Sequence, residues 1–203
     1  LHEQRVVILS SAALGLMRKE LVDTLGPETA RRLVLRFGFA DGYHDAVNLR
    51  DRSRWKDAIE GLRAGATLQA LEGIVRSVPV RLEFDAATER FDAEVEWHAS
   101  YIAEGHVQHY GQGSTPVCWS LTGYASGYAS ACLGREVYFV ESACLGQGAS
   151  HCVAVGKDAS RWGDSLEALR RDFKGGDLAH ELARLRDSVH RQHEEVARRE
   201  RRV

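Results

Sequence analysis

Residues 118–152, CWSLTGYASGYASACLGREVYFVESACLGQGASHC, contain all four cysteines of the chain. Glycine, alanine and serine alternate with aromatic residues in the first half, and an apolar, β-branched run follows at 137–140. A glycine-rich turn at 146–148 then leads to a second apolar run at 153–155. This order predicts helix, strand, turn and strand. The hairpin would bring Cys144 and Cys152 together, as a disulfide or as two metal ligands.

The composition of the whole chain favours a metal site. The 203 residues are enough for one large domain, or one domain with an appendage. We find no export signal and no apolar run of about 20 residues, so we expect a cytoplasmic protein that does not enter a membrane. Clustered cysteines in that reducing compartment more often bind metal than pair. A formal net charge of −2 gives no reason to expect nucleic-acid binding by this chain.

Helix geometry separates the cysteines into two groups. If Cys118 and Cys132 share one helix, 14 positions at 1.5 Å per residue hold them about 21 Å apart. They therefore cannot bind one ion, and we interpret Cys132 as a buried thiol. Cys118 can join the two hairpin cysteines, and the fourth ligand is Glu141, His151 or water. Three thiolates with one further donor favour zinc in a closed structural site.

The N-terminal part is predicted to be helical. Apolar residues recur at helical spacing over 6–25, and Pro27 suits the first turn of a second helix. Residues 66–75 predict a further helix that ends at Pro79. Residues 80–84 and 91–97 alternate apolar with polar side chains, which predicts an antiparallel hairpin with one buried face. That face would contain Val80, Leu82, Phe84, Phe91, Ala93, Val95 and Trp97.

Two further helices are predicted before the strand at 137–140, over 101–110 and from Pro116 onward. The second contains glycines, including Gly123 and Gly127, which cost roughly 1 kcal/mol each in a helix. Such small residues either leave room for a flat ligand or allow tight helix–sheet packing, and we favour the packing.

The C-terminal part changes character after Gly156. Residues 161–173 predict an amphipathic helix that ends at the glycines 175–176. From Asp177 onward the apolar pattern predicts a coiled coil of about three heptads, with a single solvated helix as the alternative. The repeating positions are Leu178, Leu182, Leu185, Val189, Gln192 and Val196.

Residues 32–156 resemble the effector-sensing domain of bacterial aromatic-responsive, sigma-54-dependent transcription activators, the family of phenol, xylene and toluene regulators. The segments LRFGFADGY at 35–43 and VEW at 95–97 are similar to theirs. The most specific part is the spacing of four zinc ligands, Cys118, Glu141, Cys144 and Cys152. The resemblance implies that Glu141 is the fourth ligand, and that the protein is an α+β homodimer.

The resemblance also implies an effector pocket between the hairpin and the helix after Cys118. Trp97 matches a tryptophan that hydrogen-bonds phenol in phenol-sensing members, whereas Gln69 stands where they have a histidine. Without that imidazole, the pocket favours benzene, toluene or xylene over phenol. The alternative is a phenol sensor whose specificity is altered through Gln69. The remaining residues expected to line the pocket are Leu62, Val95, Tyr128 and Phe139.

The fold class predicted is therefore α+β, with three parts. Residues 1–35 would form dimerisation helices, 36–157 the effector-binding domain with structural zinc, and 158–203 a linker towards an ATPase domain. The chain opens at Leu1, and we expect it to be part of a longer protein whose other domains bind DNA. Effector binding would relieve repression of the AAA+ ATPase and so activate aromatic-catabolism genes.

An enzyme acting on aromatic compounds is the other class of function considered. We find no defensible Ser-His-Asp set, open metal site or glycine-rich phosphate loop in the sequence. His98, His106 and His109 lie among glutamates, and we assign them to solvated faces. The sequence therefore predicts a regulatory module without catalytic activity.

Overall fold

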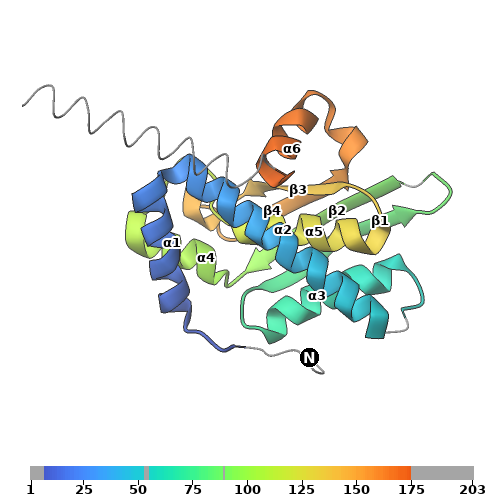
Figure 1. Cartoon of the computed structure of the whole chain (residues 1–203), viewed down its shortest axis with the longest axis horizontal. Helices are drawn as coiled ribbons and strands as arrows, with labels where there is room; N and C mark the ends of the chain where they lie inside the picture. The colour runs from blue at the N-terminus through green and yellow to red at the C-terminus, as the bar shows by residue number, and fades with distance from the viewer. Residues whose placement is uncertain (1–6, 53–54, 89, 175–203) are drawn as a thin grey trace, which may run out of the picture.

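The computed structural model describes residues 7–52, 55–88 and 90–174 (Figure 1). It confirms a mixed fold in which helices precede and flank a small antiparallel sheet. None of the described helices is both long enough and apolar enough to cross a membrane. The predicted coiled coil lies outside the described residues. The helices are α1 (Ser11–Leu25), α2 (Pro27–Arg52), α3 (Ala58–Leu71), α4 (Tyr101–Tyr110), α5 (Trp119–Leu133) and α6 (Leu166–Lys174).

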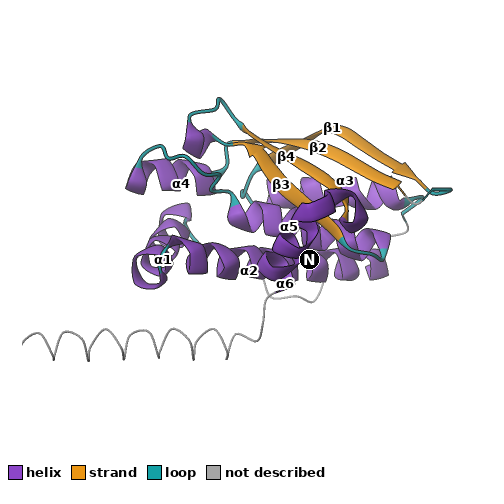
Figure 2. Ribbon diagram, turned by 90° about the horizontal axis from the view of Figure 1, so that it is seen from above, coloured by secondary structure: helices purple, strands orange, loops and turns teal. Residues whose placement is uncertain are grey.

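The four strands form one antiparallel sheet in the order β1-β2-β4-β3. They are β1 (Arg76–Asp85), β2 (Arg90–His98), β3 (Val137–Ala143) and β4 (Cys152–Asp158). Figure 2 shows the helices gathered on one side of the sheet, with α5 between the sheet and α2. The main core lies between the sheet and α5, where Phe91, Trp97 and Leu121 are almost fully buried.

The first strand differs from its prediction. Pro79 does not end a helix, because α3 ends at Leu71 and β1 already begins at Arg76. Proline is tolerated there because β1 is an edge strand, where a missing N–H removes no central ladder bond. A β-bulge between Pro79 and Arg81 then breaks the alternation. Val80 is consequently 56% exposed, and its assignment to the buried face was wrong.

Helix α2 is a single helix of 26 residues, longer than the second helix predicted from Pro27. It lies against α5 through glycines on both helices. A Cβ atom on Gly127 would lie 2.0 Å from the Phe39 carbonyl oxygen, and one on Gly38 would lie 2.2 Å from that of Ser120. The expected helix–sheet packing is therefore wrong for these glycines, which instead bring two helix backbones together.

The serines of α5 are the small residues that face the sheet. Ser126 Oγ accepts a hydrogen bond from the Phe139 N–H at 2.8 Å. Ser130 Oγ accepts from the Val137 N–H at 3.0 Å and donates to the Val137 carbonyl oxygen at 3.1 Å. Since β3 is an edge strand, these hydroxyls satisfy backbone groups that no neighbouring strand reaches.

Helix α6 begins at Leu166, later than the predicted residue 161, because a 3₁₀ segment (Ala159–Ser165) precedes it. Asp172 fixes α6 to α2 through ion pairs with Arg31 at 2.8 Å and Arg32 at 3.3 Å. Phe173 is buried, with its ring centroid 5.1 Å from that of Tyr138 on β3. The last described helix is thus packed against both α2 and the sheet edge.

Candidate ligand cavity and metal centre

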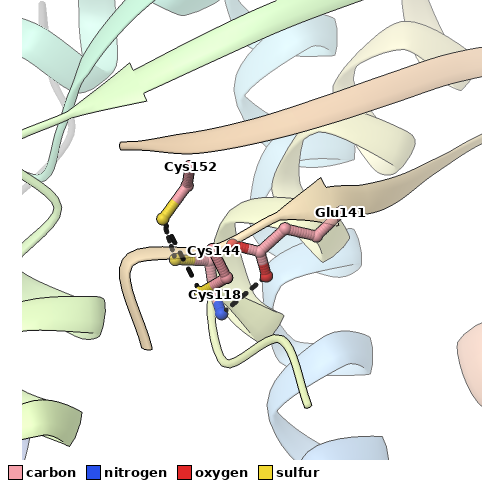
Figure 3. Close-up of side chains that lie close together, drawn as sticks. All are labelled: Cys118, Glu141, Cys144 and Cys152. Carbon is pink, nitrogen blue, oxygen red and sulfur yellow. Dashed lines mark hydrogen bonds between the residues drawn. The ribbon is translucent and has the colours of Figure 1, made fainter. Parts of the chain in front are cut away.

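Three separate elements bring four potential metal ligands together (Figure 3). Cys118 is the N-cap of α5, Glu141 lies on β3 beside a bulge, and the two hairpin cysteines flank the turn before β4. The ligand atoms of Cys118, Glu141, Cys144 and Cys152 all lie within 4.8 Å of one another, and all four residues are buried. The sulfur of Cys152 lies 3.5 Å from that of Cys118 and 3.7 Å from that of Cys144.

The chemistry of this cluster suits a cation. Glu141 Oε2 accepts from the Cys118 N–H at 3.0 Å, while its Oε1 is buried without a hydrogen-bond partner in the described part of the chain. Burial raises the pKa of Glu141 to about 8. Hydrogen bonds from Cys144 and Cys152, together with burial, raise the pKa of Cys118. A positive ion would remove these penalties, so the cluster can hold a metal ion.

Backbone donors also point at the sulfur atoms. The N–H of Leu145 donates to Cys152 Sγ, and that of Gly146 donates to Cys144 Sγ, both at 3.3 Å. Charge-assisted hydrogen bonds of this kind stabilise thiolates, the form in which cysteine binds metal. The 3₁₀ turn (Leu145–Gln147) therefore supports the cluster as well as connecting the strands.

The other candidate ligands lie elsewhere. The His151 ring stacks on His98 at 4.9 Å, and its Nε2 lies 3.6 Å from Glu96 Oε1, so it does not join the cluster. Cys132 lies near the opposite end of α5 and is half-buried rather than buried. Burial raises the pKa of its thiol to about 12.

A cavity of about 60 Å³ lies between α3, α5 and the sheet. It is lined by all six side chains that the sequence assigned to effector binding: Leu62, Gln69, Val95, Trp97, Tyr128 and Phe139. Eight further residues that the sequence did not assign also line it: Gly65, Ala66, Ser77, Pro79, Leu82, Tyr124, Ala125 and Ala129.

Polar groups around this cavity are used unequally. The hydroxyls of Tyr128 and Tyr124 donate to the Gly61 carbonyl and to Asp45, each at 3.0 Å. By contrast, Gln69 and Trp97 are 5% and 2% exposed, and neither the amide nor the indole N–H has a hydrogen-bond partner among the described residues. These two groups are the hydrogen-bonding capacity that remains for a ligand.

Two glycines allow aromatic rings to lie against backbone at this cavity. A Cβ atom on Gly65 would lie 2.7 Å from the Tyr128 ring, and one on Gly156 would lie 2.4 Å from the Phe139 ring. Sequence reasoning did not identify either glycine, since each is paired with a ring far away in the chain. A glycine in a strand is the signal that could have indicated such a close approach.

The cavity and the metal cluster adjoin. Trp97 on β2 is directly opposite Cys152 on β4, and residues in such a pair project from the same face of a sheet. A cavity residue and a potential metal ligand are therefore neighbours across one strand pair.

Comparison with known proteins gives concordant matches. Residues 1–85 match the family model described as activator of aromatic catabolism, and residues 97–158 match a second domain model. Transcriptional regulatory protein XylR of Pseudomonas putida is 34% identical over 189 residues, 93% of this chain and 33% of XylR. Phenol regulator MopR of Acinetobacter guillouiae is 33% identical over 169 residues, 83% of this chain and 30% of MopR. The chain thus spans about a third of these curated relatives.

A solved structure covers nearly the same region. The phenol-responsive sensory domain of the transcription activator PoxR, crystallised with phenol, has a TM-score of 0.80 and 38% sequence identity. The match covers 85% of this chain and 86% of that domain. The predicted resemblance is confirmed: the chain belongs to the family of effector-sensing N-terminal domains of aromatic-responsive transcription activators.

Proposed function

We propose that this chain senses a small monoaromatic effector in the cavity beside Trp97, with benzene, toluene or xylene favoured over phenol. The observation that carries the proposal is the lining of that cavity, which within the described chain contains no charged side chain. Burial of flat apolar surface would supply most of the affinity. The tyrosine hydroxyls at the cavity are already bonded within the protein, so their rings serve as apolar surface.

The cavity must widen to take such a molecule. Its volume of about 60 Å³ is well below the about 150 Å³ of a dry cavity that holds benzene. We expect α3 to move, because it contributes Leu62, Gly65 and Gln69 to the cavity and precedes the edge strand. Effector binding would then select a conformation with a displaced α3.

A phenol sensor is the second candidate, and one observation favours it. The Gln69 amide and the Trp97 indole N–H are buried without partners in the described structure, and a hydroxyl could bond to both. The phenol bound to the PoxR domain belongs to a relative of 38% identity, and it makes phenol the appropriate competitor in a binding assay.

We propose that the metal is zinc and that its role is structural. Cys118, Glu141, Cys144 and Cys152 would hold it, and four protein ligands leave no open position for a substrate. When bound, zinc would supply positive charge that stabilises the buried thiolates and fixes the ends of α5, β3 and β4. The same closed set argues against an enzyme, in agreement with the regulatory names of the relatives.

We propose a route from the cavity to the C-terminal segment through β3. Phe139 lines the cavity, and its neighbour Tyr138 projects from the opposite face of the strand to contact Phe173 of α6. A shift of Phe139 would therefore move α6 and the linker that we assign to residues 158–203. In the whole protein, this movement would relieve repression of a downstream AAA+ ATPase in a cytoplasmic, sigma-54-dependent activator that binds DNA through another domain.

We also propose that the protein is a homodimer through its N-terminal helices, within the division at residues 35 and 157 made from the sequence. Large apolar side chains are exposed along the start of the described chain and on α1 and α2. Contiguous exposed apolar surface is typical of protein interfaces. The residues are Val7, Ile8, Leu9, Leu16, Met17 and Phe37.

Isothermal titration calorimetry of the metal-loaded chain with toluene, benzene and phenol tests the sensor proposal. We expect saturable binding of the hydrocarbons and weaker binding of phenol. Stronger phenol binding would select the second candidate. A folded, metal-loaded chain that binds none of the three would refute monoaromatic sensing.

A further inference from the structure

Arg18 on α1 is a buried cation that contacts both chain neighbours of a proposed metal ligand. Its residue is 9% exposed. Nη2 donates to the Val117 carbonyl oxygen at 3.2 Å, and the guanidinium lies 4.2 Å from the centroid of the Trp119 ring. The arginine therefore contacts the residues on either side of Cys118, although α1 lies about 100 positions earlier in the sequence.

The surroundings of Arg18 do not neutralise it. None of the ion pairs in the described structure includes Arg18, and its Nε is buried without a hydrogen-bond partner there. Its other side-chain contact is neutral: Nη1 lies 3.1 Å from His106 Nδ1, which must accept this bond. A buried guanidinium without a carboxylate is costly unless another negative group lies nearby.

The proposed metal centre is such a group. Three thiolates and one carboxylate around a divalent ion leave a formal charge of −2, and all four ligands are buried. The charges of Cys118 and Cys144 are among the groups that act on Arg18. The loaded centre needs a buried cation as much as Arg18 needs an anion.

We propose that Arg18 is a positioning residue that balances the charge of the loaded metal–thiolate centre and so holds α1 against it. Metal occupancy then controls how firmly the N-terminal helix is docked. This inference rests on the proposed metal site and assigns it a second role, because α1 also carries part of the apolar surface proposed for dimerisation.

Arginine suits this position better than lysine. One guanidinium contacts a carbonyl, an imidazole and an indole face together, which a single ammonium group does not do. We therefore expect Arg18→Lys to restore part of the charge effect while losing part of the positioning.

The test compares Arg18→Gln with Lys19→Gln in the full chain loaded with zinc. Lys19 is the next residue on α1, but it is exposed and pairs with Asp23, so it is a matched control. Competition with a chromophoric chelator gives the zinc affinity, and hydrogen exchange gives the protection of α1. We expect zinc affinity to fall about 10- to 100-fold in Arg18→Gln, less in Arg18→Lys, and not in Lys19→Gln.

Wild-type zinc affinity and unchanged α1 protection in Arg18→Gln would overturn the role of Arg18 while leaving the metal site intact. A wild-type chain that binds no zinc would instead refute the metal site, and this inference with it. If Arg18→Gln does not fold, wild-type protein decides. Zinc removal should then increase exchange in α1 more than in α3, and equal changes in the two helices would contradict the proposal.

Discussion

Gln69 is the residue on which effector preference depends most. Its amide is buried at the cavity without a partner in the described chain, so a hydrocarbon ligand would leave it unsatisfied. We expect Gln69→Leu to bind toluene about tenfold more tightly, since removal of one unsatisfied buried group is worth about 1–3 kcal/mol. Gln69→His should instead favour phenol. Calorimetry with both ligands measures the two effects, and Gln108→Leu, at an exposed position on α4, should change neither affinity.

The cysteines allow a matched comparison within one chain. Cys144→Ser removes a ligand of the cluster and should give a metal-poor protein with a lower melting temperature, because the remaining thiols and Glu141 stay buried without a full set of donors. Cys132→Ser, outside the cluster, should keep its zinc. Metal analysis and thermal melts distinguish the two. Full zinc content in Cys144→Ser would contradict the ligand assignment.

The candidate site was predictable where local pattern or motif spacing determined it. Alternation along β2 placed Val95 and Trp97 on the buried face, and helix geometry excluded Cys132 from the cluster. The choice of Glu141 and Gln69 came from the family resemblance. Ser77 and Pro79 were missed, because their position at the cavity depends on a strand start that the proline concealed.

At the scale of elements, the contact of α2 with α5 should be intolerant of side chains. A Cβ atom on Gly127 would lie 2.0 Å from a carbonyl oxygen of α2, so Gly127→Ala must separate the helices. We expect it to lower the free energy of unfolding by about 1–3 kcal/mol. Gly105→Ala on α4 meets nothing within 4 Å and should raise it by about 0.5–1 kcal/mol. Urea unfolding measures both variants, and similar effects would contradict the close contact.

The C-cap of α3 introduces a pH dependence. Loss of hydration, helped by the nearby carboxylates of Asp45 and Asp41, raises the pKa of Glu72 from 4.5 to about 7. The folded protein therefore favours protonated Glu72, and the associated stability is lost as pH rises from about 4.5 through about 7. Glu72→Gln should match wild type at pH 4 and melt at a higher temperature at pH 8. An equal difference at both pH values would contradict this linkage.

Elements were predicted where periodicity was regular, as for the hairpins and the helices 101–110 and 119–133. The bulge at Val80 and the unbroken length of α2 were not predicted. Both depend on partners distant in sequence: β2 accepts an irregular edge strand, and α5 offers glycines opposite Gly38 and Gly42. Propensity alone treats those glycines as helix breakers, whereas packing against a second backbone offsets their cost.

For the whole molecule, the metal centre and the cavity should be coupled. Trp97 and Cys152 face each other across β2 and β4, so loosening of the cluster should reach the cavity. We expect zinc removal to lower the melting temperature and to weaken toluene binding, although no metal ligand lines the cavity. Calorimetry before chelation, after chelation and after zinc is restored measures this coupling. Unchanged toluene affinity in the metal-free protein would contradict it.

The glycine contact between α2 and α5 has a consequence for anyone who adapts this protein as a biosensor. With carbonyl groups of each helix at the glycines of the other, α5 has no space to retreat from the sheet. A pocket for bulkier pollutants should therefore be carved from α3 and β1, at Leu62, Ala66 or Leu82. Mutant libraries directed at the α5 side would mostly yield misfolded protein.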